Sequence, residues 1–191
     1  MLKSLKTDMS ETLENAELYC AENGITLTLV YHLSDDLLEV IAKRSQELPS
    51  LYSVNVDLLK TRLENGVFLL KKEDEVIGHI FAHKHLVNKI EVFERSSLWV
   101  SRDYRNANLG LLLMSKMTRL YDDKFLISIA QTSKVHHYNE LLGMSHITLA
   151  QMSNVLVETL EELGKLRDEL KYRYYVNAYF EKGMRIFKLM G

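Results

Sequence analysis

Residues 67–110 constrain the fold of this chain more than any other stretch. They contain three runs with the composition of strands, separated only by turn residues: Val67 to Lys71, Val76 to Val87 and Ile90 to Val100. A helical pattern begins at Leu109, so the third run enters a helix without a long loop. Strands joined by tight turns pair as antiparallel neighbours. The sequence therefore predicts an antiparallel meander that leads directly into a helix.

The rest of the chain alternates between helical and strand patterns. Further helices are expected at residues 8–22, from Ser34 to about residue 42, and at 56–64, 109–121, 133–142 and 154–172. Further strands are expected at residues 25–31, 125–130 and 146–150, and a final hairpin at residues 174–180 and 185–190 about Lys182-Gly183. We therefore expect an α/β (α+β) fold with an N-terminal helical extension and a C-terminal helix-hairpin.

Size and composition limit the classes of function. A chain of 191 residues is long enough for one domain with a substantial core. Lys and Arg number 24 against 26 Asp and Glu, and a net charge of -2 does not favour binding to nucleic acid or to an anionic membrane. Cys20 is the single cysteine, so no internal disulfide can form. With no long uncharged apolar run in the sequence, we expect a cytoplasmic protein.

The segment from Val100 to Gly110 has the features of a phosphate-binding turn. The first amides of a helix have no intrahelical partner, and the macrodipole makes that end partly positive. A pyrophosphate placed there meets aligned donors, and Gly110 allows the backbone to approach a ligand closely. Asn and Gly are also common in turns that bind nothing, so the pattern alone leaves an ordinary strand-to-helix turn open.

The same segment resembles motif A of the GNAT acetyltransferases, whose usual form reads VxPxYRGxGxG. The positions that match in register are Val100, Tyr104, Arg105 and Gly110. Arg102 stands where Pro is common, and Asn106 and Asn108 stand where Gly is usual. Asn is the non-Gly residue best suited to a positive φ, so we expect the turn to form at a cost of about 1 kcal/mol.

The resemblance extends through the order of elements over roughly residues 25–150. It implies the GNAT fold, with a mixed and mostly antiparallel central sheet flanked by helices, and acetyl-CoA as the acyl donor. In this family the strand before the motif bulges, and the pantetheine of the coenzyme lies beside it. The residues implied to offer backbone partners to the pantetheine are Leu98, Trp99 and Val100. The residues implied to hold the pyrophosphate are Arg105, Asn106, Ala107, Asn108, Leu109, Gly110 and Leu111.

Direct acyl transfer to an amine requires a base, because an alkylamine with a pKa near 10.4 is almost fully protonated at neutral pH. Glu94 lies on the strand before the motif, at the offset where histone-type members of the family carry their glutamate base. The alternative for Glu94 is structural, as a partner of Arg95 or of a residue on a neighbouring strand. Ser96 and Ser97 are expected either to order a water relay or to bond across the sheet.

Protonation of the leaving thiolate is often assigned in this family to a Tyr one turn before the glycine that ends the next helix. The usual spacing falls on Asn139, and the tyrosine here is its neighbour Tyr138. Tyr138 is therefore a candidate general acid, with packing of its ring in the core as the alternative. Asn139 is a candidate partner of the pantetheine.

Three histidines, His79, His83 and His85, share strand parity, so their side chains can emerge on one face. A metal site is one interpretation of this spacing. No acidic residue adjoins them in the sequence, and substrate contact and surface exposure are the alternatives. We therefore expect no metal.

These features predict a single GNAT-like domain over residues 1–191, with an N-terminal extension at 1–24, a core at 25–150 and a helix and hairpin at 151–191. The expected function is transfer of an acetyl or short acyl group from coenzyme A to a primary amine of a small molecule, peptide or protein. The alternative is a GNAT-shaped module that binds coenzyme A or a protein without turnover. An apolar stripe at 154–172 is compatible with a homodimer.

Overall fold

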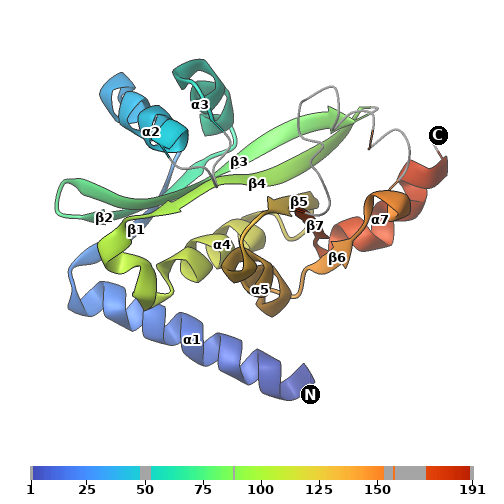
Figure 1. The fold of residues 1–191 in the computed structure, drawn as a ribbon, viewed down its shortest axis with the longest axis horizontal. Coiled ribbons are helices and arrows are strands. Elements are labelled where there is room, and N and C mark those ends of the chain that lie inside the picture. Colours follow the sequence, from blue (N-terminus) through green and yellow to red (C-terminus); the bar gives the residue numbers. More distant parts are fainter. Residues whose placement is uncertain (1, 48–52, 88, 153–156, 158–170, 190–191) are drawn as a thin grey trace. The chain divides into compact units, whose positions relative to one another are not determined.

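The computed structural model describes residues 2–47, 53–87, 89–152, 157 and 171–189 (Figure 1). Its α-helices are α1 (Leu2–Glu22), α2 (Asp35–Glu47), α3 (Val56–Leu63), α4 (Leu109–Leu120), α5 (Ser133–Leu141) and α7 (Ala178–Leu189). Its strands are β1 (Ile25–Val30), β2 (Val67–Lys72), β3 (Glu75–Val87), β4 (Ile90–Val100), β5 (Phe125–Ala130), β6 (Ser145–Ile147) and β7 (Arg173–Val176). Short 3₁₀ turns cover Arg102–Ala107 and Leu149–Gln151.

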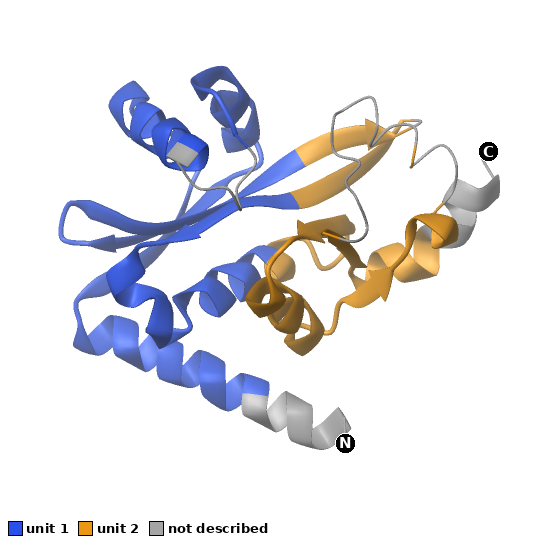
Figure 2. Ribbon diagram, viewed as in Figure 1, with its two compact units in different colours: residues 1–83, 95–117 blue, residues 84–94, 118–191 orange. Residues whose placement is uncertain are grey.

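The strands form one seven-stranded, mostly antiparallel sheet in the order β1-β2-β3-β4-β5-β7-β6. The predicted meander is confirmed, with β2 and β3 paired antiparallel so that Val67 lies opposite Phe81. The chain divides into two compact units, which Figure 2 distinguishes by colour: unit 1 holds residues 1–83 and 95–117, and unit 2 holds residues 84–94 and 118–191.

In unit 1, α2 and α3 lie on one face of the strands, and α1 and α4 lie on the other (Figure 1). One apolar cluster joins α2 and α3 to β3 through Leu38, Ile41, Leu59 and Phe81, each at most 1% exposed. The apolar spacing of α2 and the alternation of the strands supply these side chains, as the sequence patterns predict. Ser34 accepts a hydrogen bond from the Leu37 amide (3.4 Å) at the start of α2, as expected of a cap.

In unit 2, β7 pairs antiparallel with both β5 and β6. Its core gathers buried side chains of β5, β7 and α7, including Ile127, Tyr174, Val176 and Phe180. The predicted strand at 146–150 is shorter than expected, ending as β6 at Ile147. The N-terminal helix, in contrast, begins earlier than predicted, at Leu2. The helix predicted at 154–172 falls almost entirely outside the described residues.

The predicted C-terminal hairpin is wrong. Strand β7 ends at Val176, and helix α7 follows where a second strand was expected. Asn177 starts this helix, because its side-chain oxygen accepts a hydrogen bond from the Phe180 amide (3.0 Å) and its carbonyl accepts one from the Glu181 amide (3.0 Å). Gly183 lies inside the helix, where any side chain would collide with the ring of Phe125. The glycine thus serves close packing, not a turn.

Asn177 should be one of the most sensitive residues of unit 2. Beyond capping α7, it accepts a hydrogen bond from the Leu126 amide (3.3 Å) and donates to the carbonyls of Tyr121 (3.2 Å) and Lys124 (2.9 Å), and it is 6% exposed. Asn177→Ala would leave several buried backbone groups without a partner, so we expect it to lower the free energy of unfolding by about 2–3 kcal/mol in urea titrations. Asn177→Asp keeps the acceptor oxygen but turns a second carboxylate oxygen toward the carbonyls of Tyr121 and Lys124, so it should not recover the loss. A loss below about 1 kcal/mol for Asn177→Ala would contradict this account.

Within the described residues, no helix combines the length and the apolar character needed to cross a bilayer.

Candidate active site

The junction between β4 and α4 is a compact turn built by backbone hydrogen bonds. The Ser101 amide donates to the Ile77 carbonyl (2.7 Å), and the Tyr104 amide donates to the Ser101 carbonyl (3.0 Å). Asn108 then adopts the left-handed conformation (φ 54), and its carbonyl accepts the first helical hydrogen bond of α4, from the Leu112 amide (3.1 Å). The expectation of a positive φ is confirmed at Asn108, whereas Asn106 lies within the 3₁₀ turn.

Burial fixes the start of α4, and Gly110 stays partly accessible there. Leu109 and Leu111 are fully buried and anchor the helix in the core of unit 1, and Gly110 between them is only partly buried. Arg105 and Asn106 of the preceding turn are exposed. The helix start is therefore reached by solvent at Gly110 and along the preceding turn, and an anionic ligand is favoured at such a place.

Arg105 closes this turn across its base. Its Nε donates a hydrogen bond to the Val100 carbonyl (3.0 Å), which links the last residue of β4 to the middle of the turn. The resemblance implies that Arg105 holds the pyrophosphate and that Val100 offers a backbone partner to the pantetheine. The structure adds a direct bond between the two, so Arg105 also holds the turn in shape.

The left-handed residue Asn108 gives a direct test of the turn. Asn108→Val places a β-branched side chain at positive φ, which costs about 1–3 kcal/mol and should shift the start of α4. We expect it to weaken coenzyme A binding about 10-fold or more in calorimetric titrations. Asn108→Gly accepts the same φ without strain, and it should bind at least as tightly as the wild type. Strong binding by the Val variant would show that the turn does not form the site.

Strand β4 departs from regular geometry at Ser97, whose φ is 51. Two neighbours hold it there: Arg62 Nη1 on α3 donates to Ser97 Oγ (2.7 Å), and His79 Nδ1 on β3 donates to the Ser97 carbonyl (2.8 Å). Residues 96–99 are half-buried, whereas residues 92–95 before them are buried. The irregular strand expected before the motif is therefore present, and Ser97 bonds to neighbouring elements of unit 1.

Trp99 lies in a polar cluster beside this irregularity. The His79 ring stacks on the Trp99 ring at 5.5 Å, and the Arg44 guanidinium lies 4.0 Å over the same ring. Gly78 on β3 lets the backbone of Trp99 lie close to it, because a Cβ at residue 78 would be 3.3 Å from the Trp99 carbonyl oxygen. Surface exposure, one of the alternatives for His79, is excluded, because only 1% of the residue is accessible. Burial, aided by the positive charge of Arg44, lowers the pKa of His79 to about 3, so its imidazole is neutral at physiological pH.

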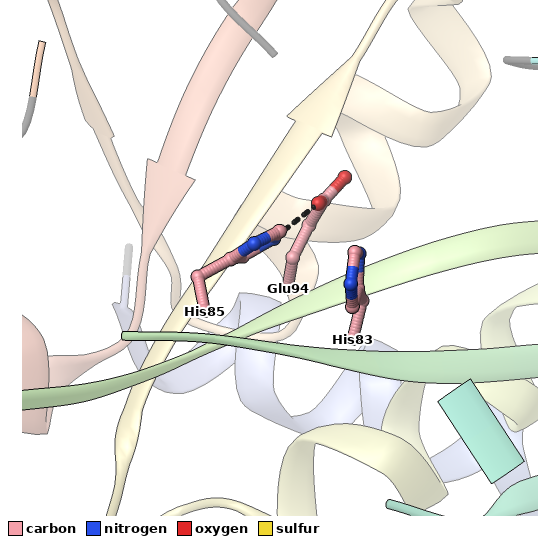
Figure 3. A group of neighbouring side chains, drawn as sticks. All are labelled: His83, His85 and Glu94. Atoms are coloured by element: carbon pink, nitrogen blue, oxygen red, sulfur yellow. Dashed lines mark hydrogen bonds and ion pairs between the residues drawn. The ribbon is translucent and has the colours of Figure 1, made fainter. Parts of the chain in front are cut away.

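Glu94 is buried and hydrogen-bonded to a histidine. Its Oε2 lies 2.8 Å from His85 Nε2, and both residues are nearly inaccessible (Figure 3). This is the neighbouring-strand partner left open by the sequence, since His85 belongs to β3. Arg95, the other partner considered, directs its Nη1 toward the Met114 carbonyl (3.5 Å), and burial lowers its pKa to about 9. Surface exposure is excluded for His85 as well.

Glu94 also lies near His83, a proximity that the sequence analysis missed. The ligand atoms of His83, His85 and Glu94 all lie within 4.8 Å of one another. The signal was present in the hairpin itself. Counting back from a two-residue turn at Asn88-Lys89 places His83 opposite Glu94.

Tyr138 and Asn139 lie in α5, within unit 2, whereas residues 98–111 belong to unit 1. Tyr138 is 5% exposed, and burial raises the pKa of its hydroxyl, which therefore stays protonated at neutral pH. Lys134 Nζ lies 5.7 Å from the centre of its ring. Asn139 is completely buried. The Tyr138 environment suits a proton donor and equally suits a core residue, so both alternatives stand.

The sequence matches no protein-family model, and a search of curated proteins gives no match. Solved structures are similar in fold. The chain is 14% identical to Arabidopsis thaliana Naa50 in complex with the bisubstrate analogue CoA-Ac-MVNAL, with a TM-score of 0.55 over 78% of this chain and 96% of that one. It is 19% identical to Escherichia coli ElaA, with a TM-score of 0.56 over 80% and 99% of the two chains.

A third similar structure is N-acetylglutamate synthase from Neisseria gonorrhoeae complexed with coenzyme A and N-acetyl-glutamate. It shares 11% identity, with a TM-score of 0.58 over 80% of this chain, and the match spans 35% of the longer enzyme. The mixed sheet, the helices that flank it and the strand-to-helix turn at Asn108 agree with this likeness. The chain has the fold of the GNAT acetyltransferases.

Proposed function

We propose that this protein is an N-acyltransferase, which moves an acetyl or short acyl group from coenzyme A directly to a primary amine. The observation that carries the proposal is the turn at residues 101–108, in which left-handed Asn108 starts α4 and the exposed Arg105 and Asn106 precede the partly accessible Gly110. Such a helix start favours a diphosphate. We further propose that both units belong to one catalytic domain.

In this proposal the residues from Arg105 to Leu111 bind the diphosphate, and the backbone of Leu98, Trp99 and Val100 binds the pantetheine. The irregular geometry at Ser97 supports the second role, because it interrupts regular strand pairing just before these residues. A backbone amide there would polarise the thioester carbonyl as negative charge develops on its oxygen.

Glu94 is the proposed general base. Its carboxylate accepts a proton from the acceptor ammonium, and the neutral nitrogen then attacks the thioester carbon. The carbon–nitrogen bond forms, the carbon–sulfur bond breaks, and the thiolate takes a proton from Tyr138. The acylated nitrogen releases its second proton, which restores the Tyr138 hydroxyl, and Glu94 returns the first proton to solvent. The hydrogen bond from His85 fixes the Glu94 carboxylate in the interior of the protein, which supports a positioned base.

The acceptor is proposed to carry its amine on an amino acid or on a peptide. Naa50 is solved with a bisubstrate analogue that includes a peptide sequence, and N-acetylglutamate synthase with N-acetyl-glutamate. Because both similarities are low in sequence identity, they support the class of acceptor and not its identity.

Free thiol release measures the proposed reaction directly. Acetyl-CoA is incubated with the protein and a panel of amino acids and of peptides with free amino termini, and the released thiol is titrated. Cys20, the single cysteine, is buried, so the protein itself adds little signal. We expect release only when an amine is present. Calorimetric binding of acetyl-CoA with no release across the panel would favour a non-catalytic module, and absence of binding would contradict both functions.

A further inference from the structure

His83, His85 and Glu94 form a compact group in the hairpin of β3 and β4 (Figure 3). His83 and His85 are two residues apart on one strand, which directs their side chains to the same face. Glu94 comes from the adjacent strand of the sheet. One ligand atom from each residue lies within 4.8 Å of the other two. The three groups therefore surround a single small volume.

The three side chains are of the types that bind zinc in proteins. Two imidazole nitrogens and one carboxylate oxygen bind Zn²⁺ in proteins, with bonds of about 2.0–2.2 Å. Two such ligands on one ion lie roughly 3–3.5 Å apart. His85 Nε2 and Glu94 Oε2 are 2.8 Å apart, so a small outward adjustment would admit an ion between them.

Burial adds a second argument for a cation. The side chains of His85 and Glu94 are 3% and 7% exposed, and an ionised carboxylate in such an environment loses most of its hydration. A divalent ion would add a strong electrostatic attraction that offsets this loss. His83 is half-buried, so the group opens toward solvent on its side, and a fourth ligand position would be left for water.

From these observations we infer that His83, His85 and Glu94 bind a divalent transition-metal ion of the Zn²⁺ class. The inference goes beyond acyl transfer and does not depend on it. It also departs from the sequence-based expectation of no metal, which rested on the absence of an acidic partner for the histidines. Glu94 can act as a base or as a ligand but not as both at once, so binding is measured in the absence of substrates.

Co²⁺ provides the test, because it occupies zinc sites and absorbs visible light when four-coordinate. Titration of the full chain with Co²⁺ is expected to give d–d bands that saturate at one ion per chain and disappear on addition of Zn²⁺. His83→Ala and His85→Ala should each weaken the affinity about 10-fold or more. The control His137→Ala removes an exposed histidine of α5 and should leave the titration unchanged.

His85 is buried, so His85→Ala is checked for folding by circular dichroism. His83 is half-buried, so His83→Ala still tests the site if His85→Ala does not fold. Thermal unfolding gives an independent readout, since a bound ion should raise the Tm of the wild type more than that of His83→Ala at the same metal concentration. If the wild type gives no Co²⁺ bands and no Tm shift with Zn²⁺, or if His83→Ala binds as tightly as wild type, the inference is overturned.

Discussion

Glu94→Gln is expected to lower kcat for amine acylation by about 10²–10⁴-fold, the contribution that a positioned general base makes. Gln has nearly the same size as Glu and can still bond to His85, but it cannot take a proton from an ammonium group. The Kd for acetyl-CoA should stay unchanged, because the proposed diphosphate site lies in residues 105–111. Steady-state thiol release and calorimetry with the same protein samples separate the two quantities.

Glu91→Gln is the matched control for this prediction. Glu91 lies on the same strand, is exposed, and pairs with Lys84 across the hairpin (3.3 Å). Its substitution removes one negative charge near the protein surface, so kcat should change little. A Glu94→Gln enzyme with the kcat of the Glu91→Gln enzyme would mean that another group takes the proton.

Acidification should destabilise the protein through His79, whose pKa falls from an ordinary 6.5 to about 3 on folding. Above pH 6.5 the imidazole is neutral in both states and contributes nothing. Below pH 6.5 the unfolded chain binds a proton that the folded chain excludes, so the free energy of unfolding decreases until about pH 3. Between pH 6.5 and pH 3, this one side chain should lower the free energy of unfolding by about 4–5 kcal/mol in total.

Urea titrations at several pH values measure this loss, with His79→Asn as the comparison. The Asn side chain keeps an N–H donor for the Ser97 carbonyl but does not titrate, so its stability should depend less on pH between 6.5 and 3. Parallel pH profiles for the wild type and this variant would show that His79 is not the group responsible.

Local patterns were sufficient for the parts of the fold that depend on local physics. Alternating apolar residues and turn residues predict the meander of β2, β3 and β4, and the structure confirms it. The C-terminal segment shows the limit of such reasoning. Gly183 reads as a turn residue, yet its lack of a side chain allows helix α7 to pack on Phe125, a contact that no local pattern reveals.

In the candidate site, too, only the features that depend on a single residue could be predicted from the sequence. The suitability of Asn for a positive φ predicted the turn at Asn108, because the preference belongs to the residue itself. The surroundings of the histidines in β3 depend on which residues face them on the neighbouring strand. His79 and His85 share strand parity, but His79 packs on Trp99 and His85 bonds to Glu94, and only the register of the hairpin and the path of β4 at Ser97 distinguish them.

Backbone amide chemical shifts test the central claim most directly. The uniformly ¹⁵N-labelled protein is titrated with coenzyme A, and the shift of each assigned amide is followed. We expect the largest, saturable changes at Leu109, Gly110 and Leu111, the first amides of α4, with smaller changes at Leu98 to Val100. Saturable binding that leaves the amides of residues 105–111 unmoved would contradict the proposal that the start of α4 holds the diphosphate.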